Sequence, residues 1–275
     1  RSVALTLVGR LGDVDSADPS FVLWELGRMV ANDPILSGLF DEGIEGLDER
    51  LRNEPQCFTF ITEFDSFIND YGSRGSNEWE TACETGGTQP SSVLILIDRM
   101  RFAKNSNSPT ERAKILSQNR EAALLKARSQ LGVLGLWLFE KAFNASVLFS
   151  QSRERSKTTI IDLIHVARII SRELAQRTSA RREGGELIDL WFILESELDE
   201  YVKNPSAFDE QVSDRKAVRK ELSKRVPPFT FEGDLPNPST WPLRKNISSE
   251  EYPNLNVGET LEGFGGCPGI AEGTA

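Results

Sequence analysis

The sequence predicts an all-α protein that ends in a long irregular segment rich in proline and glycine. Three observations lead to this prediction. Apolar residues recur at the three- and four-residue spacing of one helix face through much of residues 1–226. Prolines and serines stand where helices would begin, and glycines stand where they would end. From Pro227 to Gly263 this periodicity stops, and Pro, Gly and Asn become frequent.

Composition limits the class of protein and its partners. The 275 residues are 39% hydrophobic and 27% charged, which suits a packed core. The net charge of −10 argues against nucleic acid or an anionic membrane as the main partner. The three cysteines are far apart and form no CxxC pair, as in a reduced, cytoplasmic protein without a metal site. We expect no signal peptide and no membrane span, and we expect the chain to be a piece of a longer polypeptide.

The elements before the central stretch follow from caps and periodicity. We expect a short helix over residues 2–12, and then a helix capped by Ser20 that carries the apolar residues Phe21 to Met29. The later predictions are a helix from Pro34 to Phe40, one over Ile44–Arg52, one from Pro55 to Gly72, a loop over Gly72–Gln89, an apolar helix capped by Ser91 or Ser92 and running through Met100, and a long charged helix from Pro109.

The most apolar part of the sequence is Leu131–Leu174. Residues 133–149 leave little polar face and are shorter than the roughly 20 apolar residues of a membrane span, so we expect a helix buried in a soluble domain. A basic cluster, Arg153–Lys157, follows, and then an amphipathic helix over Thr158–Arg177.

Shorter elements complete the chain. Gly184 and Gly185 end the amphipathic helix. The apolar run Leu187–Leu194 fits a short strand or a buried turn. Further helices are predicted over Glu195–Tyr201 and Asp209–Lys224.

Two pairs of residues at helical spacing are candidates for a site. Arg153 and Lys157 are four residues apart, so they share one helix face and suit a phosphate group, although a solvated helix end would show the same pattern. Arg74 and Glu78 are also four apart. They form either an ion pair that ties the loop to the helices or the lining of a pocket in which Glu78 orients a hydroxyl group.

The aromatic residues of the central stretch also allow two interpretations. Trp137, Phe139 and Phe143 fit the core of the domain, but they would equally suit a pocket for the apolar body of an alcohol. The single histidine, His165, lies one turn from Ile161 and Ile169, and we interpret it as a packing residue of the helix.

Three motifs in order resemble a known family. They are Tyr71–Trp79 (YGSRGSNEW), the segment Arg153–Lys157 with the downstream run Ile188–Leu194, and Gly263–Gly273 (GFGGCPGIAEG). Their order and separations resemble rifampin phosphotransferase and related phosphoenolpyruvate-synthase-like proteins, in the region between the ATP-binding and phosphohistidine domains. The resemblance covers most of the chain from about Phe58 onward.

The resemblance implies a mechanism and a set of partners. An ATP-grasp domain or subunit, with ATP and Mg²⁺, would phosphorylate a histidine on a swivelling domain and release AMP and phosphate. That domain would carry the phosphoryl group to a hydroxyl of a small organic acceptor, aromatic or phenolic, bound in the helical domain. Residues 1–226 would be this acceptor-binding domain, 227–262 a linker, and 263–275 the start of the swivelling domain. Arg153 and Lys157 would match the family's phosphate-contacting residues.

The sequence also departs from the family. It has no Thr-Ser-His segment for a phosphohistidine and no GxxxxGK[ST] nucleotide loop, so we expect this piece to be inactive alone. The alternative function is a non-catalytic helical scaffold that docks an ATP-binding partner. A Thr-Ser-His segment after Ala275 would favour the enzyme.

Overall fold

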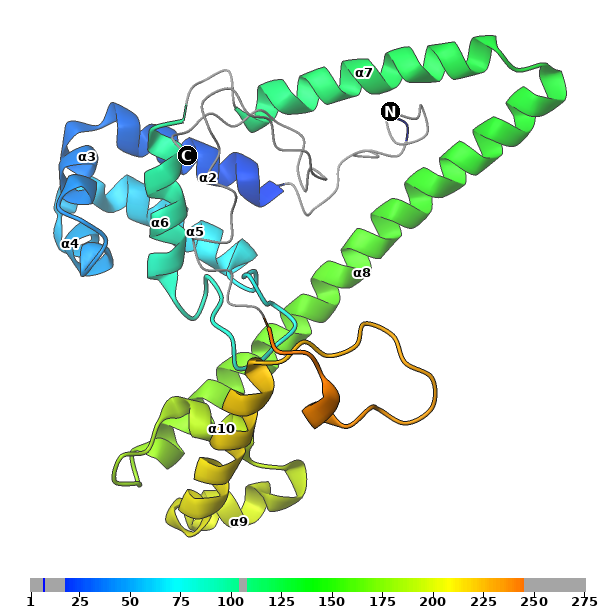
Figure 1. Cartoon of the computed structure of the whole chain (residues 1–275). Coiled ribbons are helices and arrows are strands. Elements are labelled where there is room, and N and C mark those ends of the chain that lie inside the picture. The colour runs from blue at the N-terminus through cyan, green and yellow to red at the C-terminus, as the bar shows by residue number, and fades with distance from the viewer. Residues whose placement is uncertain (1–6, 8–17, 104–107, 245–275) are drawn as a thin grey trace, which may run out of the picture. The chain divides into compact units, whose positions relative to one another are not determined.

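The computed structural model describes Leu7, residues 18–103 and residues 108–244 of the chain. These residues form helices joined by turns and loops and contain no strand, so the predicted all-α class is confirmed (Figure 1). The chain divides into two compact units, Arg1–Leu194 and Glu195–Ala275. The motif Gly263–Gly273 and, apart from Leu7, the predicted helix over residues 2–12 lie outside the described residues.

The first unit begins with short helices close to the predicted ones. The helix from Pro34 has Asp33 as its N-cap, whose carboxylate accepts from the backbone N–H of Ile35 and of Leu36. Ser20, Ser91 and Ser92 lie inside helices and do not cap them. These helices begin at Asp18 and at Pro90, and proline suits the first helical position. The elements are α2 (Asp18–Asn32), α3 (Pro34–Asp41), α4 (Leu47–Asn53), η1 (Pro55–Cys57), α5 (Phe58–Tyr71) and α6 (Pro90–Arg101).

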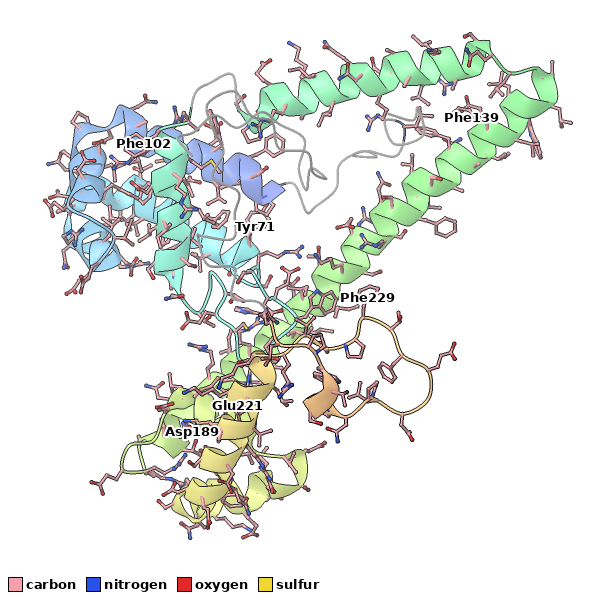
Figure 2. The ribbon with its side chains drawn as sticks, in the orientation of Figure 1. Tyr71, Phe102, Phe139, Asp189, Glu221 and Phe229 are labelled. Atoms are coloured by element: carbon pink, nitrogen blue, oxygen red, sulfur yellow. The ribbon has the colours of Figure 1, made fainter. Side chains whose placement is uncertain are left out.

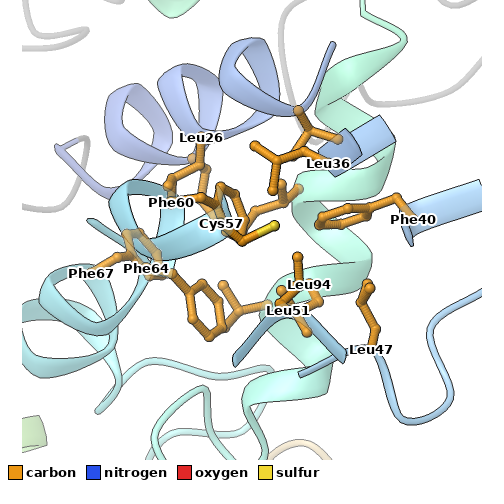
Figure 3. Packing of buried hydrophobic residues seen from close by; sticks show 14 residues of the cluster. Leu26, Leu36, Phe40, Leu47, Leu51, Cys57, Phe60, Phe64, Phe67 and Leu94 are labelled. Carbon is orange, nitrogen blue, oxygen red and sulfur yellow. The ribbon is translucent and has the colours of Figure 1, made fainter. Parts of the chain in front are cut away.

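These helices enclose one hydrophobic core (Figure 3). Phe60, Phe64 and Phe67 recur at helical spacing and are the buried face of α5. Phe40 of α3 meets Phe60 edge to face, with ring centroids 5.9 Å apart. The other members of the core are Leu23, Leu26, Val30, Leu36, Leu47, Leu51, Cys57, Val93, Leu94 and Ile97.

Two arginines fix the end of α6 against its neighbours. Arg28 of α2 donates to the carbonyl oxygens of Met100 and Arg101 at the C-terminal end of α6. Its guanidinium also lies 4.7 Å from the centre of the Trp24 ring. Arg101 in turn forms an ion pair of 2.7 Å with Asp41 at the end of α3.

The central stretch is a single long helix. α7 (Pro109–Ser129) ends in a turn at residues 130–132, and α8 (Val133–Ser179) then runs for 47 residues. The predicted apolar helix, the basic cluster and the predicted amphipathic helix are therefore consecutive parts of α8 (Figure 1).

The prediction that residues 133–149 are buried is wrong. Val133 is 91% exposed and Phe149 is 70% exposed, and Leu134, Trp137, Leu138 and Leu148 are exposed as well. The described residues leave this part of α8 uncovered, and its ion pair with α7, Arg128–Glu140 at 2.6 Å, is polar. By length and composition α8 also meets the requirements of a membrane span, which for one helix is weak evidence of a membrane protein.

The run after α8 is not a strand but a short 3₁₀ helix, η3 (Leu187–Phe192), in which Asp189 and Leu190 are buried. Gly184 has a φ of 71°, which allows the chain to reverse after the end of α8. The buried Asp189 carboxylate then accepts from Arg182, 2.6 Å away, and from the backbone N–H of Glu186, 2.9 Å away. This network fixes η3 to the turn that follows α8, and η3 packs against α8.

The second unit is smaller and has its own core. Its helices are η4 (Glu195–Glu197), α9 (Leu198–Lys203), η5 (Pro205–Phe208), α10 (Asp209–Ser223) and η6 (Pro238–Thr240). Tyr201 is fully buried and meets Phe208 edge to face at 5.7 Å. Arg215 of α10 forms a bidentate pair with Glu197, with both N–O distances below 3 Å (2.6 and 2.7 Å).

Part of the predicted linker is ordered by α10. Beyond this helix, the N–H of Val226 donates to the carbonyl oxygen of Pro242 at 2.9 Å, and Arg225 donates to that of Trp241 at the same distance. Trp241 itself donates to the carbonyl oxygen of Pro236. The described part of residues 227–262 therefore folds back on the end of α10.

The surroundings of two helical glycines, Gly27 in α2 and Gly38 in α3, predict opposite effects of alanine substitution on stability. A Cβ at Gly27 would lie 2.6 Å from the Cβ of Met100, whereas a Cβ at Gly38 would meet no atom within 4 Å. We expect Gly27→Ala to lower the free energy of unfolding by about 1–3 kcal/mol. Gly38→Ala should raise it by up to about 1 kcal/mol, because alanine favours the helix. Thermal unfolding followed by circular dichroism would measure both, and equal effects would contradict the packing.

Candidate functional site

The candidate site lies where the loop between α5 and α6, Gly72–Gln89, meets the middle of α8. Two backbone hydrogen bonds close the neck of this loop. The N–H of Gly87 donates to the carbonyl oxygen of Gly72 at 2.7 Å, and the N–H of Gly86 donates to that of Arg74 at 3.0 Å. The loop is thus a closed unit with its own hydrogen bonds rather than an open connection.

The glycines of the loop allow its backbone to approach other groups closely. A Cβ at Gly72 would lie 2.2 Å from the carbonyl oxygen of Ile68, and a Cβ at Gly75 would lie 2.8 Å from that of Glu84. A Cβ at Gly87 would lie 2.9 Å from Nε2 of His165 on α8. The glycine pattern of the YGSRGSNEW segment therefore has a structural cause.

Arg168 of α8 is the main attachment of the loop. Its side chain is fully buried, and its Nη2 donates to the carbonyl oxygens of Glu78 at 2.7 Å and Glu80 at 3.1 Å. Burial lowers the pKa of the guanidinium. Its Nε has no hydrogen-bond partner among the described residues. A buried cation of this kind holds the loop backbone strongly, because the carbonyl oxygens are its main compensation for lost water.

His165 contacts the same arginine. Nδ1 of the imidazole lies 3.2 Å from Nη1 of Arg168 and 3.3 Å from the hydroxyl oxygen of Thr85, which is buried. A guanidinium can only donate, so Nδ1 is the acceptor and the neutral ring carries its proton on Nε2. The predicted packing role of His165 thus includes a polar contact with the loop.

Further contacts extend the attachment along α8 and η3. Arg172 forms an ion pair of 3.3 Å with Glu84. Trp191 of η3 donates from its indole nitrogen to the hydroxyl oxygen of Thr81 at 2.9 Å. The loop is therefore held at several points from its middle to its end.

Glu78 is the centre of a small charged cluster. One oxygen of its carboxylate lies 2.9 Å from Nζ of Lys157 and 3.5 Å from Nη1 of Arg74. Nη2 of Arg74 donates to the hydroxyl oxygen of Thr158 at 2.8 Å, and that hydroxyl donates to the carbonyl oxygen of Glu154 at 3.1 Å. The side chain of Glu78 is only 13% exposed.

The structure thus brings three of the predicted site residues together: Arg74, Glu78 and Lys157. Arg153 is not part of this cluster. Its side chain is 75% exposed and pairs with the neighbouring Glu154. Arg155 is exposed on α8 as well. Arg153 and Lys157 share a helix face as predicted, but they contact different partners in this structure.

The predicted aromatic residues lie elsewhere on α8. Phe139 and Phe143 are stacked with ring centroids 6.0 Å apart, and Trp137 is exposed. Figure 2 shows Phe139 near the beginning of α8. With a rise of about 1.5 Å per residue, Phe143 is about 21 Å from Lys157 along the helix axis. The structure therefore separates the predicted aromatic set from the charged cluster.

A cavity of about 400 Å³ lies in another part of the first unit. It is lined by Leu51, Arg52, Glu54, Pro55, Phe58 and Ile61. None of the predicted site residues lines it. The part of the chain that the structure describes holds no group of three or more His, Cys, Asp or Glu side chains placed to bind a metal ion.

Sequence reasoning missed Thr158 and Arg168. Both lie on the side of α8 that meets the loop, together with Ile161, His165 and Arg172. Because this stripe mixes polar and apolar residues, hydrophobic periodicity does not reveal it. The available signal was Arg168, which lies four residues before Arg172 and on the same helix stripe as His165.

One comparison with known proteins gives a match. The family described as the rifampicin phosphotransferase fourth domain matches residues 1–156, which is more than half of the chain. The match includes Arg74, Glu78, the three aromatic residues and Arg153, and it ends one residue before Lys157. No curated protein matches the chain.

The contact between His165 and Arg168 predicts an acid-sensitive loop. Burial, and then the charge of Arg168, lower the pKa of His165 from its ordinary 6.5, against the opposing effect of Asp162. Below pH 6.5 a detached or unfolded state therefore binds more protons than the folded one. The stability contributed by neutral His165 is complete above that pH, and we expect it to be lost as the pH falls through the folded pKa.

Hydrogen exchange of the amides of residues 80–89, measured from pH 7.5 to pH 5, would test this prediction after correction for the intrinsic pH dependence. We expect the loop to lose protection in the wild-type protein and to keep more of it in His165→Gln, whose side-chain oxygen still accepts from Arg168. Equal losses in the two proteins would show that other groups titrate there.

Proposed function

The chain belongs to the family of the rifampicin phosphotransferase fourth domain, and from this premise we propose that it is the acceptor-binding part of an ATP-dependent phosphotransferase. In this proposal a phosphohistidine on a swivelling domain delivers its phosphoryl group to a hydroxyl of the acceptor. The nitrogen–phosphorus bond breaks, the oxygen–phosphorus bond forms, and the proton of the hydroxyl passes to the histidine nitrogen that loses the phosphoryl group. Overall, ATP, water and the acceptor are consumed, and AMP and phosphate are released beside the phosphorylated acceptor.

The observation that carries the proposal is the position of Lys157. Phosphoryl transfer requires in-line positioning and cations that neutralise the equatorial oxygens. Glu78 holds the ammonium group of Lys157 at the edge of the loop, beside the guanidinium of Arg74. Arg153 lies one turn earlier on the same face and is exposed, so it is accessible to an incoming carrier domain.

The chemistry of the nucleotide is assigned outside this chain. ATP with Mg²⁺ would supply the phosphoryl group in an ATP-grasp domain or subunit, and we assign no residue of this chain to it. The chain's own residues bind the acceptor, orient its hydroxyl and neutralise charge during the transfer. We place this activity in the cytoplasm, as expected for a reduced, acidic protein.

The distance between the aromatic residues and Lys157 along α8 restricts the size of the acceptor. Because about 21 Å lies between Phe143 and Lys157, one small phenol would not reach both. We therefore propose that Trp137, Phe139 and Phe143 contact the apolar body of a large aromatic acceptor, while Arg153 and Lys157 act on the phosphoryl group. The alternative function remains a non-catalytic helical scaffold. The uncovered apolar part of α8 favours that alternative, since such a surface suits a protein partner.

Substitution of the basic residues tests the catalytic proposal. With the ATP-grasp and phosphohistidine parts present, we expect Lys157→Met and Arg153→Ala each to lower kcat about 10²-fold or more, the scale of losing one well-placed charge. Arg155→Ala is the matched control and should be mild, because this side chain is exposed in the same turn. If all three variants turned over at the wild-type rate, the basic face would be ordinary surface.

Acceptor binding gives a second test. Trp137→Ala should raise the KM for the acceptor and leave kcat nearly unchanged, because an apolar contact made equally in the ground and transition states contributes only to binding. The side chain is exposed, so the substitution should not disturb the fold. An unchanged KM together with loss of binding to an ATP-grasp partner would support the scaffold instead.

The isolated chain gives a third test, since nucleotide binding is assigned to another domain. We expect calorimetry to detect no binding of ATP with Mg²⁺ to this chain and no change of its melting temperature. Tight binding would contradict the assignment as an acceptor domain.

A further inference from the structure

We propose that Glu78 is a displaceable occupant of an oxyanion site formed by Arg74, Lys157 and Thr158, and that a phosphate or phosphoryl group takes its place. The inference rests on the proposed function for the source of that group. It assigns Arg74 and Thr158, which the sequence did not connect with phosphate, to the same site as Lys157.

Two cations face one carboxylate oxygen atom of Glu78. Oε1 of Glu78 accepts from Lys157 at 2.9 Å and faces Arg74 at 3.5 Å. Arg74 is itself oriented by its 2.8 Å hydrogen bond to Thr158. The carboxylate therefore lies where two positioned cations converge, which is the arrangement that binds phosphate oxygens.

The positive charges of this cluster outnumber the negative charge. Two cations surround one carboxylate, so the cluster carries one uncompensated positive charge. A phosphate dianion would neutralise both cations, which a carboxylate cannot do. The partial burial of the cluster reduces screening by water, so this difference in charge matters more here than on an open surface.

The loop does not depend on the carboxylate of Glu78 for its attachment to α8. Arg168 holds the loop through the backbone carbonyl oxygen of Glu78, not through its side chain. Glu84 and Thr81 attach the loop independently to Arg172 and Trp191. The side chain of Glu78 is thus able to rotate away while the backbone of the loop stays in place.

In this proposal the site passes through a defined cycle. In the resting chain Glu78 neutralises Lys157 and Arg74 and keeps them in position. When a phosphoryl group arrives, its oxygens replace the carboxylate on the two cations, and Glu78 moves toward solvent. After the product leaves, the carboxylate returns. No bond is made or broken in this exchange, which is a replacement of one anion by another.

Phosphate binding to the 275-residue chain tests the exchange without turnover. Titration of inorganic phosphate, followed by ³¹P nuclear magnetic resonance, should show about tenfold tighter binding to Glu78→Gln than to the wild-type chain, because the competing carboxylate is removed. The gain should disappear in the double variant Glu78→Gln/Lys157→Met. Arg155→Ala, which removes a nearby cation outside the cluster, should leave the affinity unchanged.

Two further probes distinguish the sources of the phosphoryl group. Phosphohistidine stands for the carrier domain and phenyl phosphate for a phosphorylated product. A gain in affinity with either probe, or with inorganic phosphate, supports the site, and the order of the gains identifies the source it serves. No gain with any of the three would overturn the proposal.

Hydrogen exchange of residues 72–89 guards against a purely structural explanation. The loop of Glu78→Gln should be as protected as that of the wild-type chain, and a marked loss of protection would overturn the proposal by showing that the carboxylate anchors the loop. The outcomes also distinguish a failure of the displacement of Glu78 from a failure of the proposed function. A gain in phosphate affinity without phosphoryl transfer in the assembled enzyme would contradict the proposed function alone. Transfer that depends on Lys157, without the gain, would contradict the displacement of Glu78 alone.

Discussion

Arg168 donates from a fully buried guanidinium to two carbonyl oxygens of the loop Gly72–Gln89, and the arrangement of the candidate site depends on this contact. A buried arginine is costly unless its hydrogen bonds are made, so the loop backbone must stay where it satisfies them. That constraint fixes the backbone of Glu78, and with it the reach of the carboxylate toward Lys157. The glycines of the loop also allow this packing. A Cβ at Gly75 would lie too close to the carbonyl oxygen of Glu84, and a Cβ at Gly87 would lie too close to the ring of His165.

The middle of α8 and the part before residue 150 differ in their surroundings. The middle of the helix is covered by the loop and by η3 and carries polar residues inward. The part before residue 150 is apolar and uncovered in the described structure. The proposed acceptor domain would need both a charged place for the phosphoryl group and an apolar surface for the acceptor, and in that proposal one continuous helix would supply both.

Sequence reasoning predicted the fold class and most helices because caps, prolines and apolar spacing are local signals. The helix from Pro34 is an example. The spacing of Arg74 and Glu78 left two alternatives open, and the ion pair was one of them. Sequence reasoning failed where the partner of a helix face decides the outcome. In the predicted amphipathic helix over Thr158–Arg177, the apolar Ile160 and Ile169 are about half exposed, whereas the charged Arg168 is fully buried. Apolar spacing alone cannot tell which face of a long helix meets a polar loop, and it also misjudged the exposure of residues 133–149.

The continuity of α8 has a consequence for how this protein tolerates change in length. Because a helix advances by about 100° per residue, the angular relation between Trp137 and Lys157 is set by the number of residues between them. One residue inserted or deleted near residue 150 would turn the aromatic side away from the direction of the ammonium group by that angle, without breaking a single contact of the loop. Relatives of this protein would therefore vary there in steps close to whole helical turns, three or four residues at a time.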